Sequence, residues 1–239
     1  MFSKILIAAT VASLGLIGRS MANDAPARFT VRIENITKPE AFTASNGTKW
    51  SLAFSPGTAI VHTKSAPVFN AGKKDRRKGL EAQAEDGDPS MLAKSLTAAK
   101  GIKSVTVFNI PVGASSPGPT APGGAYEITV SAIPGDRLSL TLMMGQSNDW
   151  FYAPAELGIE LFKNGQPISG DITSQLVMWD AGTEINQEPG IGPDQGPRQK
   201  APNTGKAENG VVRKIDDGKA YSTASKIMRV TITPEMPQM

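Results

Sequence analysis

Cysteine is absent from the 239-residue sequence, and histidine occurs once, at His62. Thiol catalysis and zinc sites built from several histidines or cysteines are therefore excluded. A Ser-His-Asp triad would have to use His62, which stands in the strand-like segment TAIVHT, and the sequence has no G-x-S-x-G motif. We therefore interpret His62 as a structural residue. Because no disulfide can form, a buried core or a bound ion must stabilise the fold.

Long apolar runs are also lacking, except at the N-terminus. There a positively charged MFSK precedes the 14 apolar residues ILIAATVASLGLIG and the small-x-small sequence SMA. This pattern predicts a signal peptide over residues 1–22, cleaved after Ala22, and a secreted or periplasmic mature chain. An uncleaved anchor is the alternative, because Arg19 lies close to the proposed cut. No later segment reaches the roughly 20 apolar residues of a membrane span, so we expect none after cleavage.

Excess charge is small as well. The formal net charge is +3, and removing the signal peptide with Lys4 and Arg19 lowers it to about +1. We therefore expect no nucleic-acid partner. The one basic run, at positions 73–78, has no interleaved aromatic residue and is interpreted as a solvated loop.

Alternation of apolar and polar residues is the main pattern that the sequence does contain. RFTVRIENI at 28–36 places Phe29, Val31 and Ile33 on one face, which is typical of a strand in a half-buried antiparallel sheet. Two further alternating segments, 125–133 and 137–144, flank Pro134-Gly135-Asp136 and predict a β-hairpin.

Other segments with strand character follow at intervals separated by turn residues. They are 49–54, 58–62, 102–112, 157–162, 175–179, 211–215 and 227–233. So many short strands predict an all-β fold, an antiparallel β-sandwich, with a barrel as the other possibility.

Helix is expected only in the middle of the sequence. Asp88 can cap a helix that ends before Gly101, with Met91, Leu92 and Leu96 on one face, and GLEAQAEDG before it can add a turn or two. Residues 186–210 hold four prolines, five glycines and one aliphatic residue, which predicts a long surface loop. Strand-like sequence resumes beyond that loop, so we predict one domain over residues 23–239.

Two aspartates lie in predicted loops, each shortly after the end of a predicted strand. Asp149 follows the strand that ends at Met144, and Asp180 follows QLVMW, with Gly182 able to make a sharp turn beside it. Glu127 would lie within reach of Asp149 if the predicted hairpin is regular. Three carboxylates with carbonyl and water oxygens suit calcium, which takes six to eight oxygen ligands. The alternative is that both aspartates cap turns and Glu127 faces solvent.

The same segments resemble a known family. SNDWF at 147–151, followed about thirty positions later by WDAGTE at 179–184, is similar to the paired signature of the spondin N-terminal domain. That family includes the extracellular-matrix proteins F-spondin and mindin and a branch of bacterial exported proteins. The bacterial branch is also resembled by FTVRIENIT, GLEAQAEDGDPS, PGIGPDQGPRQ and RVTITP, so the likeness spans nearly all of residues 28–234.

The resemblance implies a β-sandwich similar to a C2 domain, with a calcium ion (Ca²⁺) bound at one end. Its ligands would be Asp149 and Asp180 by direct match of the motifs, with Glu127 as the glutamate from an earlier strand. Animal members usually carry proline where Asn148 stands, and they use disulfides that this sequence cannot form. Their partners, integrins and microbial surface polysaccharide, imply a cell-surface or envelope glycan or protein as the partner class here.

Three functional classes remain open. The leading one is an exported, non-catalytic, calcium-binding module that acts in cell-surface or envelope binding or adhesion. The second is a structural envelope protein whose ion only completes the fold. The third is a carboxylate-based glycan hydrolase with an acid and base pair such as Asp149 and Glu184.

Overall fold

The computed structural model describes residues 26–63, 68–75 and 78–235. The predicted signal peptide, residues 1–22, lies outside this part of the chain, as do residues 76–77 of the basic run. The described chain is mostly β-structure in antiparallel sheets with three short α-helices. The predicted all-β sandwich is confirmed.

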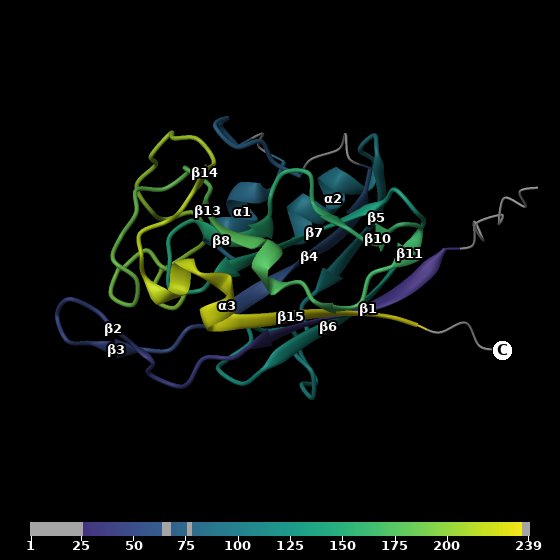
Figure 1. The fold of residues 1–239 in the computed structure, drawn as a ribbon. Coiled ribbons are helices and arrows are strands. Elements are labelled where there is room, and N and C mark those ends of the chain that lie inside the picture. The colour runs from purple at the N-terminus through teal and green to yellow at the C-terminus, as the bar shows by residue number, and fades with distance from the viewer. Residues whose placement is uncertain (1–25, 64–67, 76–77, 236–239) are drawn as a thin grey trace, which may run out of the picture.

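Two sheets face each other and form the body of the molecule (Figure 1). The four-stranded sheet has the order β12 (Gly170–Asp171), β15 (Met228–Pro234), β1 (Ala27–Asn35) and β6 (Ala125–Ala132). The seven-stranded sheet has the order β14 (Arg213–Lys214), β13 (Leu176–Asp180), β8 (Trp150–Pro154), β7 (Arg137–Met144), β4 (Phe54–His62) and β5 (Ile102–Phe108), and β9 (Ile159–Glu160) pairs with β7.

Smaller elements complete the described fold. The hairpins are β2 (Phe42–Thr43) with β3 (Lys49–Trp50), and β10 (Phe162–Lys163) with β11 (Gln166–Pro167). The helices are α1 (Leu80–Glu85), α2 (Ser90–Thr97) and α3 (Ala224–Ile227), with 3-10 turns η1 (Thr173–Gln175) and η2 (Ala220–Ser222). The two helices expected in the middle of the sequence are confirmed, whereas α3 was not predicted.

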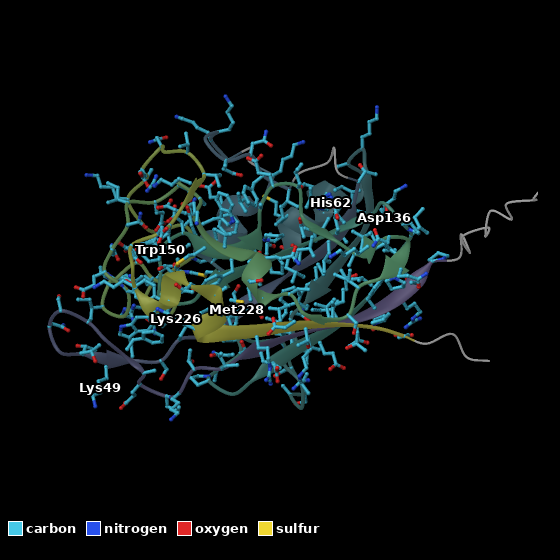
Figure 2. The ribbon with its side chains drawn as sticks, viewed as in Figure 1. Lys49, His62, Asp136, Trp150, Lys226 and Met228 are labelled. Carbon is cyan, nitrogen blue, oxygen red and sulfur yellow. The ribbon has the colours of Figure 1, made fainter. Side chains whose placement is uncertain are left out.

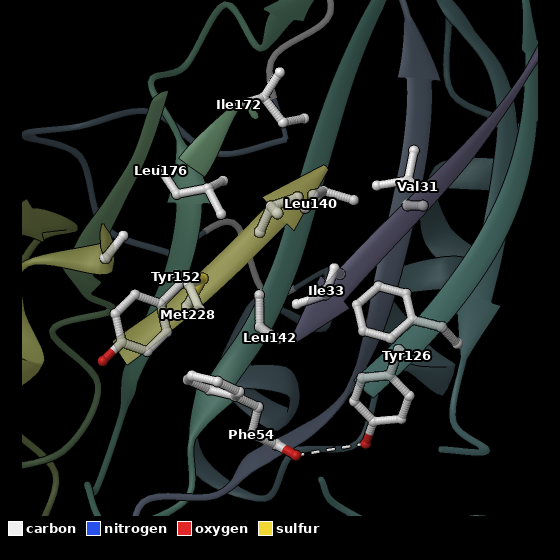
Figure 3. Close-up of a cluster of buried hydrophobic side chains, with 14 of the residues drawn as sticks. Val31, Ile33, Phe54, Tyr126, Leu140, Leu142, Tyr152, Ile172, Leu176 and Met228 are labelled. Atoms are coloured by element: carbon white, nitrogen blue, oxygen red, sulfur yellow. Dashed lines mark hydrogen bonds between the residues drawn. The ribbon is translucent and has the colours of Figure 1, made fainter. Parts of the chain in front are cut away.

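The first core fills the space between the two sheets (Figure 3). The alternating residues of β1 point into it, as predicted, since Phe29, Val31 and Ile33 are buried. From the facing sheet come Leu140 and Leu142 of β7. The Phe54 and Tyr152 rings of that same sheet pack edge to face in this core, with centroids 5.6 Å apart. The Tyr126 hydroxyl donates a hydrogen bond to the Gly118 carbonyl oxygen at 2.6 Å, with the Phe54 carbonyl oxygen 3.4 Å away, so its polar end is satisfied inside the core.

The second core lies on the other face of the seven-stranded sheet, under α1 and α2. Phe151 and Trp179 of that sheet pack on Phe69, with ring centroids 5.4 and 4.9 Å apart. The helices contribute Leu80 and Leu92. Because helices cover its outer face, the seven-stranded sheet is buried on both sides, which explains why β7 and β8 are almost entirely buried.

Two details of the sequence interpretation are wrong. Pro134-Gly135-Asp136 does form a tight turn, with Gly135 at φ 97°, but β6 and β7 enter different sheets, so the turn connects the two layers and is not a hairpin. Alternation cannot separate these cases, because both strands turn an apolar face to the same core. Met91 is also misassigned, because 56% of it is exposed while Leu92 and Leu96 are buried.

We predict that Leu140→Ala lowers the free energy of unfolding by about 2–5 kcal/mol, because it removes a fully buried side chain from the first core. The matched control is Leu157→Ala, since Leu157 is 44% exposed and should lose less than about 0.5 kcal/mol. Urea denaturation of both variants provides the measurement. Equal losses would contradict the assignment of the core.

Candidate metal centre

Two of the predicted ligands meet because β8 and β13 are neighbours in register. Asp180 is the last residue of β13 and pairs with Trp150, the first residue of β8, so Asp149 and Asp180 reach the same edge of the sheet. The Ala181 amide donates to the Asp149 carbonyl oxygen at 3.0 Å and fixes the two segments together. The expected convergence of these two aspartates is therefore observed.

Two aromatic rings anchor the segment that carries Asp149. Successive residues of a strand point to opposite faces, so Trp150 enters the first core and Phe151 the second. The Ser147 hydroxyl accepts a hydrogen bond from the Trp150 amide at 3.1 Å and thereby holds the turn before the strand. Asp149 was expected to lie in a loop, but strand β8 begins directly after it, at Trp150, and runs to Pro154. The continuous apolar run WFYA is typical of a strand buried on both faces.

Glu208 is the third carboxylate of the group. One ligand oxygen from each of Asp149, Asp180 and Glu208 lies within 4.8 Å of the others. Glu208 stands in the loop before β14, and its amide donates to the Thr183 carbonyl oxygen at 2.8 Å. This buried acidic group can hold a metal ion, because three such oxygens are at a separation that one cation can bridge.

Asp149 is fully buried, and only one of its two carboxylate oxygens has hydrogen-bond partners among the described residues. Its Oδ2 accepts hydrogen bonds from the Thr183 amide at 2.8 Å, the Glu184 amide at 3.1 Å and the Thr183 hydroxyl at 3.2 Å. Its Oδ1 has no hydrogen-bond partner among the described residues and is shielded from solvent. A buried carboxylate oxygen without a partner is costly, so this atom requires a proton or a cation.

Arg213 compensates part of the charge of the other two carboxylates. Its guanidinium lies 2.6 Å from Asp180 Oδ2 and 2.8 Å from Glu208 Oε1. Gly182, at φ 70°, makes the predicted sharp turn, and its amide donates to Asp180 Oδ1 at 2.6 Å. Three carboxylates against one guanidinium leave two negative charges when all are ionised. One divalent cation would neutralise them.

Two further buried glutamates surround this group. Glu184 accepts hydrogen bonds from Asn148 Nδ2 at 3.1 Å and from the Gly205 amide at 2.8 Å. Glu85, at the end of α1, is 2% exposed, and its Oε2 has no partner in the described part of the chain. The Thr183 side chain lies between the two regions, because its hydroxyl donates to Asp149 Oδ2 at 3.2 Å and its proximity opposes the rise in the pKa of Glu85.

Burial shifts the titration of these carboxyls toward neutral pH. Burial and the nearby charge of Asp180 raise the pKa of Asp149 to about 7, although hydrogen bonds from Glu184 and Thr183 oppose the rise. Burial raises the pKa of Asp180 and of Glu184 as well. Burial, with smaller contributions from Glu184, Glu81 and Asp149, raises the pKa of Glu85 to about 8. Near pH 7 this end of the sandwich therefore binds protons that a metal ion would displace.

Glu127 does not join the group, so its assignment as the third ligand is wrong. It lies on β6 in the four-stranded sheet, its side chain is 50% exposed, and it pairs with Arg32 at 3.2 Å. The assignment required a regular hairpin between β6 and β7, and those strands belong to different sheets. Glu208 was missed because it lies in an irregular loop, where no periodic pattern indicates which way a side chain points.

The long loop expected at 186–210 is confirmed in outline, since no helix or strand lies between β13 and β14. It is more compact than a surface loop, because it folds around the buried Gln195, whose Nε2 donates to the Glu188 carbonyl oxygen at 2.9 Å. Its last residues return to the site, where Ala207 bridges to Glu184 and the Gly210 amide donates to the Gly182 carbonyl oxygen.

His62 lies far from the acidic group. His62 pairs with Arg137 at the start of β7, whereas β8, which follows Asp149, pairs with the last part of β7, and Figure 2 labels His62 and Trp150 well apart. The imidazole is buried, with Nδ1 2.7 Å from the Thr63 carbonyl oxygen and Nε2 2.9 Å from the Ser139 hydroxyl. Burial lowers the pKa of His62, so the ring is a neutral, hydrogen-bonded core residue.

The comparisons with known proteins add no relative. No protein-family model matches this sequence, and no curated protein matches it. Among the described residues, no helix combines the length and apolar character needed to cross a membrane.

We predict that Glu85→Gln stabilises the protein increasingly as pH rises. The folded-state pKa is about 8 against 4.5 for the free group, so the folded state binds more protons and wild-type stability falls between these pH values. The variant lacks this loss and should gain about 1–3 kcal/mol at pH 9, the scale for an unsatisfied buried charge. Urea denaturation at pH 5 and 9 in chelator is the measurement.

Glu40→Gln, at an exposed position, controls for the loss of one acidic group. A Glu85→Gln variant with no stabilisation at pH 9 relative to pH 5 would show that Glu85 ionises in the folded protein without penalty.

Proposed function

We propose that this protein is an exported, non-catalytic β-sandwich module that binds Ca²⁺ through Asp149, Asp180 and Glu208. In this proposal the ion rigidifies the loops at one end of the sandwich, and those loops bind a glycan or protein of the cell surface or envelope. The observation that carries the proposal is Asp149 Oδ1, a fully buried carboxylate oxygen with no partner among the described residues, in a group whose oxygens lie within 4.8 Å.

The chemistry of the donors favours a hard cation. All three side chains supply oxygen, and His62, the one histidine of the sequence, pairs with the start of β7, away from this group. Calcium accepts irregular oxygen ligation from loops, whereas magnesium demands near-ideal octahedral geometry. Arg213 occupies one oxygen of Asp180 and both oxygens of Glu208, so its side chain must share or release these contacts when the ion binds.

Calcium would stabilise this end by connecting three chain segments. Asp149 lies before β8, Asp180 ends β13, and Glu208 precedes β14. One ion shared by them restrains the loop 186–210 at its end, which pre-organises any binding surface that the loop forms and so reduces the entropy lost on association.

The structural alternative uses the same ion without a partner, and only binding data separate it from the module. The hydrolase alternative is disfavoured by access, because Asp149 and Glu184 are 0% and 3% exposed, and a glycosidase needs both carboxyls open to the substrate. Turnover of chromogenic glycosides that is lost in Glu184→Gln would favour the hydrolase over our proposal.

We predict that Asp149→Asn removes most of the calcium-dependent rise in melting temperature. For a single ligand-binding site, stabilisation follows the ratio of free calcium to its dissociation constant, about 2.7 kcal/mol at a hundredfold excess. The measurement is a thermal melt in calcium and in chelator, with elemental analysis of the purified protein.

Glu127→Gln is the matched control and should retain the full rise, because Glu127 lies outside the acidic group. If the wild-type protein melts at the same temperature in calcium and in chelator, the metal centre is refuted. If it responds to calcium but binds nothing on glycan and cell-surface arrays, the structural alternative replaces the module.

A further inference from the structure

A hollow lined by acidic side chains lies beside α1, and its acids are not among the proposed metal ligands. It has a volume of about 240 Å³ and is lined by described residues of α1, the start of α2 and the loop 186–210. Three of the lining side chains, Glu81, Glu85 and Asp86, are acidic, and none of the lining residues is basic. Glu81 and Glu85 are four positions apart on α1, so they lie on the same face of the helix.

Glu85 distinguishes this hollow from an ordinary acidic surface. It lines the hollow although only 2% of it is exposed, and its Oε2 has no hydrogen-bond partner among the described residues. Ordinary surface carboxylates are hydrated and need no partner, whereas this oxygen is removed from water. Because Glu85 lines the hollow, a cationic group that enters it would compensate the charge of this carboxylate.

Asp86 is held in place by the loop that forms the opposite wall. Its Oδ1 accepts hydrogen bonds from Gln199 Nε2 at 3.0 Å and from the Asn203 amide at 3.2 Å. Its orientation is therefore set before any ligand arrives, which lowers the entropy lost on binding.

The spacing of the acids favours an organic cation over a bare metal ion. Within the described residues, the one acidic group whose oxygens approach within 4.8 Å is Asp149, Asp180 and Glu208, so the acids of the hollow do not converge on one inner-sphere ion. A guanidinium or ammonium group is larger and donates several hydrogen bonds in different directions, which matches separated carboxylates.

The hollow also has an apolar side. Met91 is 56% exposed and lines it together with Ala82. The methylene stem of a basic side chain packs on such a surface while its charged end contacts carboxylates. Contact with such a stem also explains why Met91 is exposed on α2, whose two leucines, Leu92 and Leu96, are buried.

We propose that this hollow binds an alkylguanidinium or alkylammonium group, with the charged end at Glu81, Glu85 and Asp86 and the apolar stem on Met91. The ligand is a free amine or guanidine, or the side chain of an arginine or lysine in a peptide. Both sources present the same chemistry.

The test is isothermal titration calorimetry of the full chain with N-acetylarginine amide, carried out in chelator and again in calcium. N-acetylcitrulline amide is the neutral probe of similar shape. Titration at pH 9 is preferred because burial raises the pKa of Glu85 to about 8, with Glu184, Glu81 and Asp149 adding to the rise and the Thr183 side chain opposing it. At that pH the guanidinium stays charged and Glu85 is mostly ionised.

We expect the arginine probe to bind at least tenfold more tightly than the citrulline probe. Glu85→Gln and Glu81→Gln should each weaken binding of the arginine probe about tenfold, and Met91→Ala about threefold. Asp216→Asn, which removes an exposed acid lining another hollow, should leave the affinity unchanged. Agmatine and a short arginine peptide, titrated in parallel, distinguish a free ligand from a side chain of a polypeptide.

Equal binding of the charged and neutral probes, or an affinity that survives both Glu81→Gln and Glu85→Gln, would overturn the proposal. If Glu85→Gln fails to fold, Glu81→Gln and Met91→Ala still decide the matter, because both positions are at least partly exposed. No binding of any probe in chelator or in calcium would also overturn it.

Discussion

The burial of carboxylates at one end of the sandwich is the constraint on which this region depends. Four carboxylates here are each at most 3% exposed: Glu85, Asp149, Asp180 and Glu184. Among the described residues, Arg213 is the one arginine that forms ion pairs with the group Asp149, Asp180 and Glu208. Burying an unpaired charge is costly, so the group must take up protons, a metal ion or both. The raised pKa values of Asp149 and Glu85 reflect the same cost, because burial favours the protonated, uncharged form of each carboxyl.

The sandwich can sustain this cost because its two cores fix the strands that carry the acids. With no cysteine in the sequence, no disulfide contributes, and stability rests on apolar packing on both faces of the seven-stranded sheet. Trp150 and Phe151 are buried in different cores, so β8 cannot rotate or slip without exposing one ring. The position of Asp149 is therefore a consequence of packing, which is how a buried polar group with an unpartnered oxygen persists in a folded protein.

The sequence was sufficient where a residue's role depends on local pattern. Alternation located β1 and β7, and the residues after two strands located Asp149 and Asp180. It failed where tertiary pairing decides the outcome. The Pro134 turn chemistry is the same for a hairpin and for a connection between layers, and that ambiguity misplaced Glu127. Glu208 and Glu85 come to the site through a loop and a helix end, whose positions follow from packing on strands distant in the chain.

One loop joins the two acidic regions, and this connects their behaviour. The loop 186–210 contacts Asp86 through Gln199 and Asn203, contacts Glu184 through Gly205, and carries Glu208 into the metal group. The Thr183 side chain adds a link, since its hydroxyl donates to Asp149 Oδ2 and its proximity opposes the rise in the pKa of Glu85. A cation taken up in either region would neutralise part of the negative charge that attracts a cation to the other. By thermodynamic linkage, a cation bound in the first region changes the cation affinity of the second by some factor. A cation bound in the second region must then change the affinity of the first by that same factor.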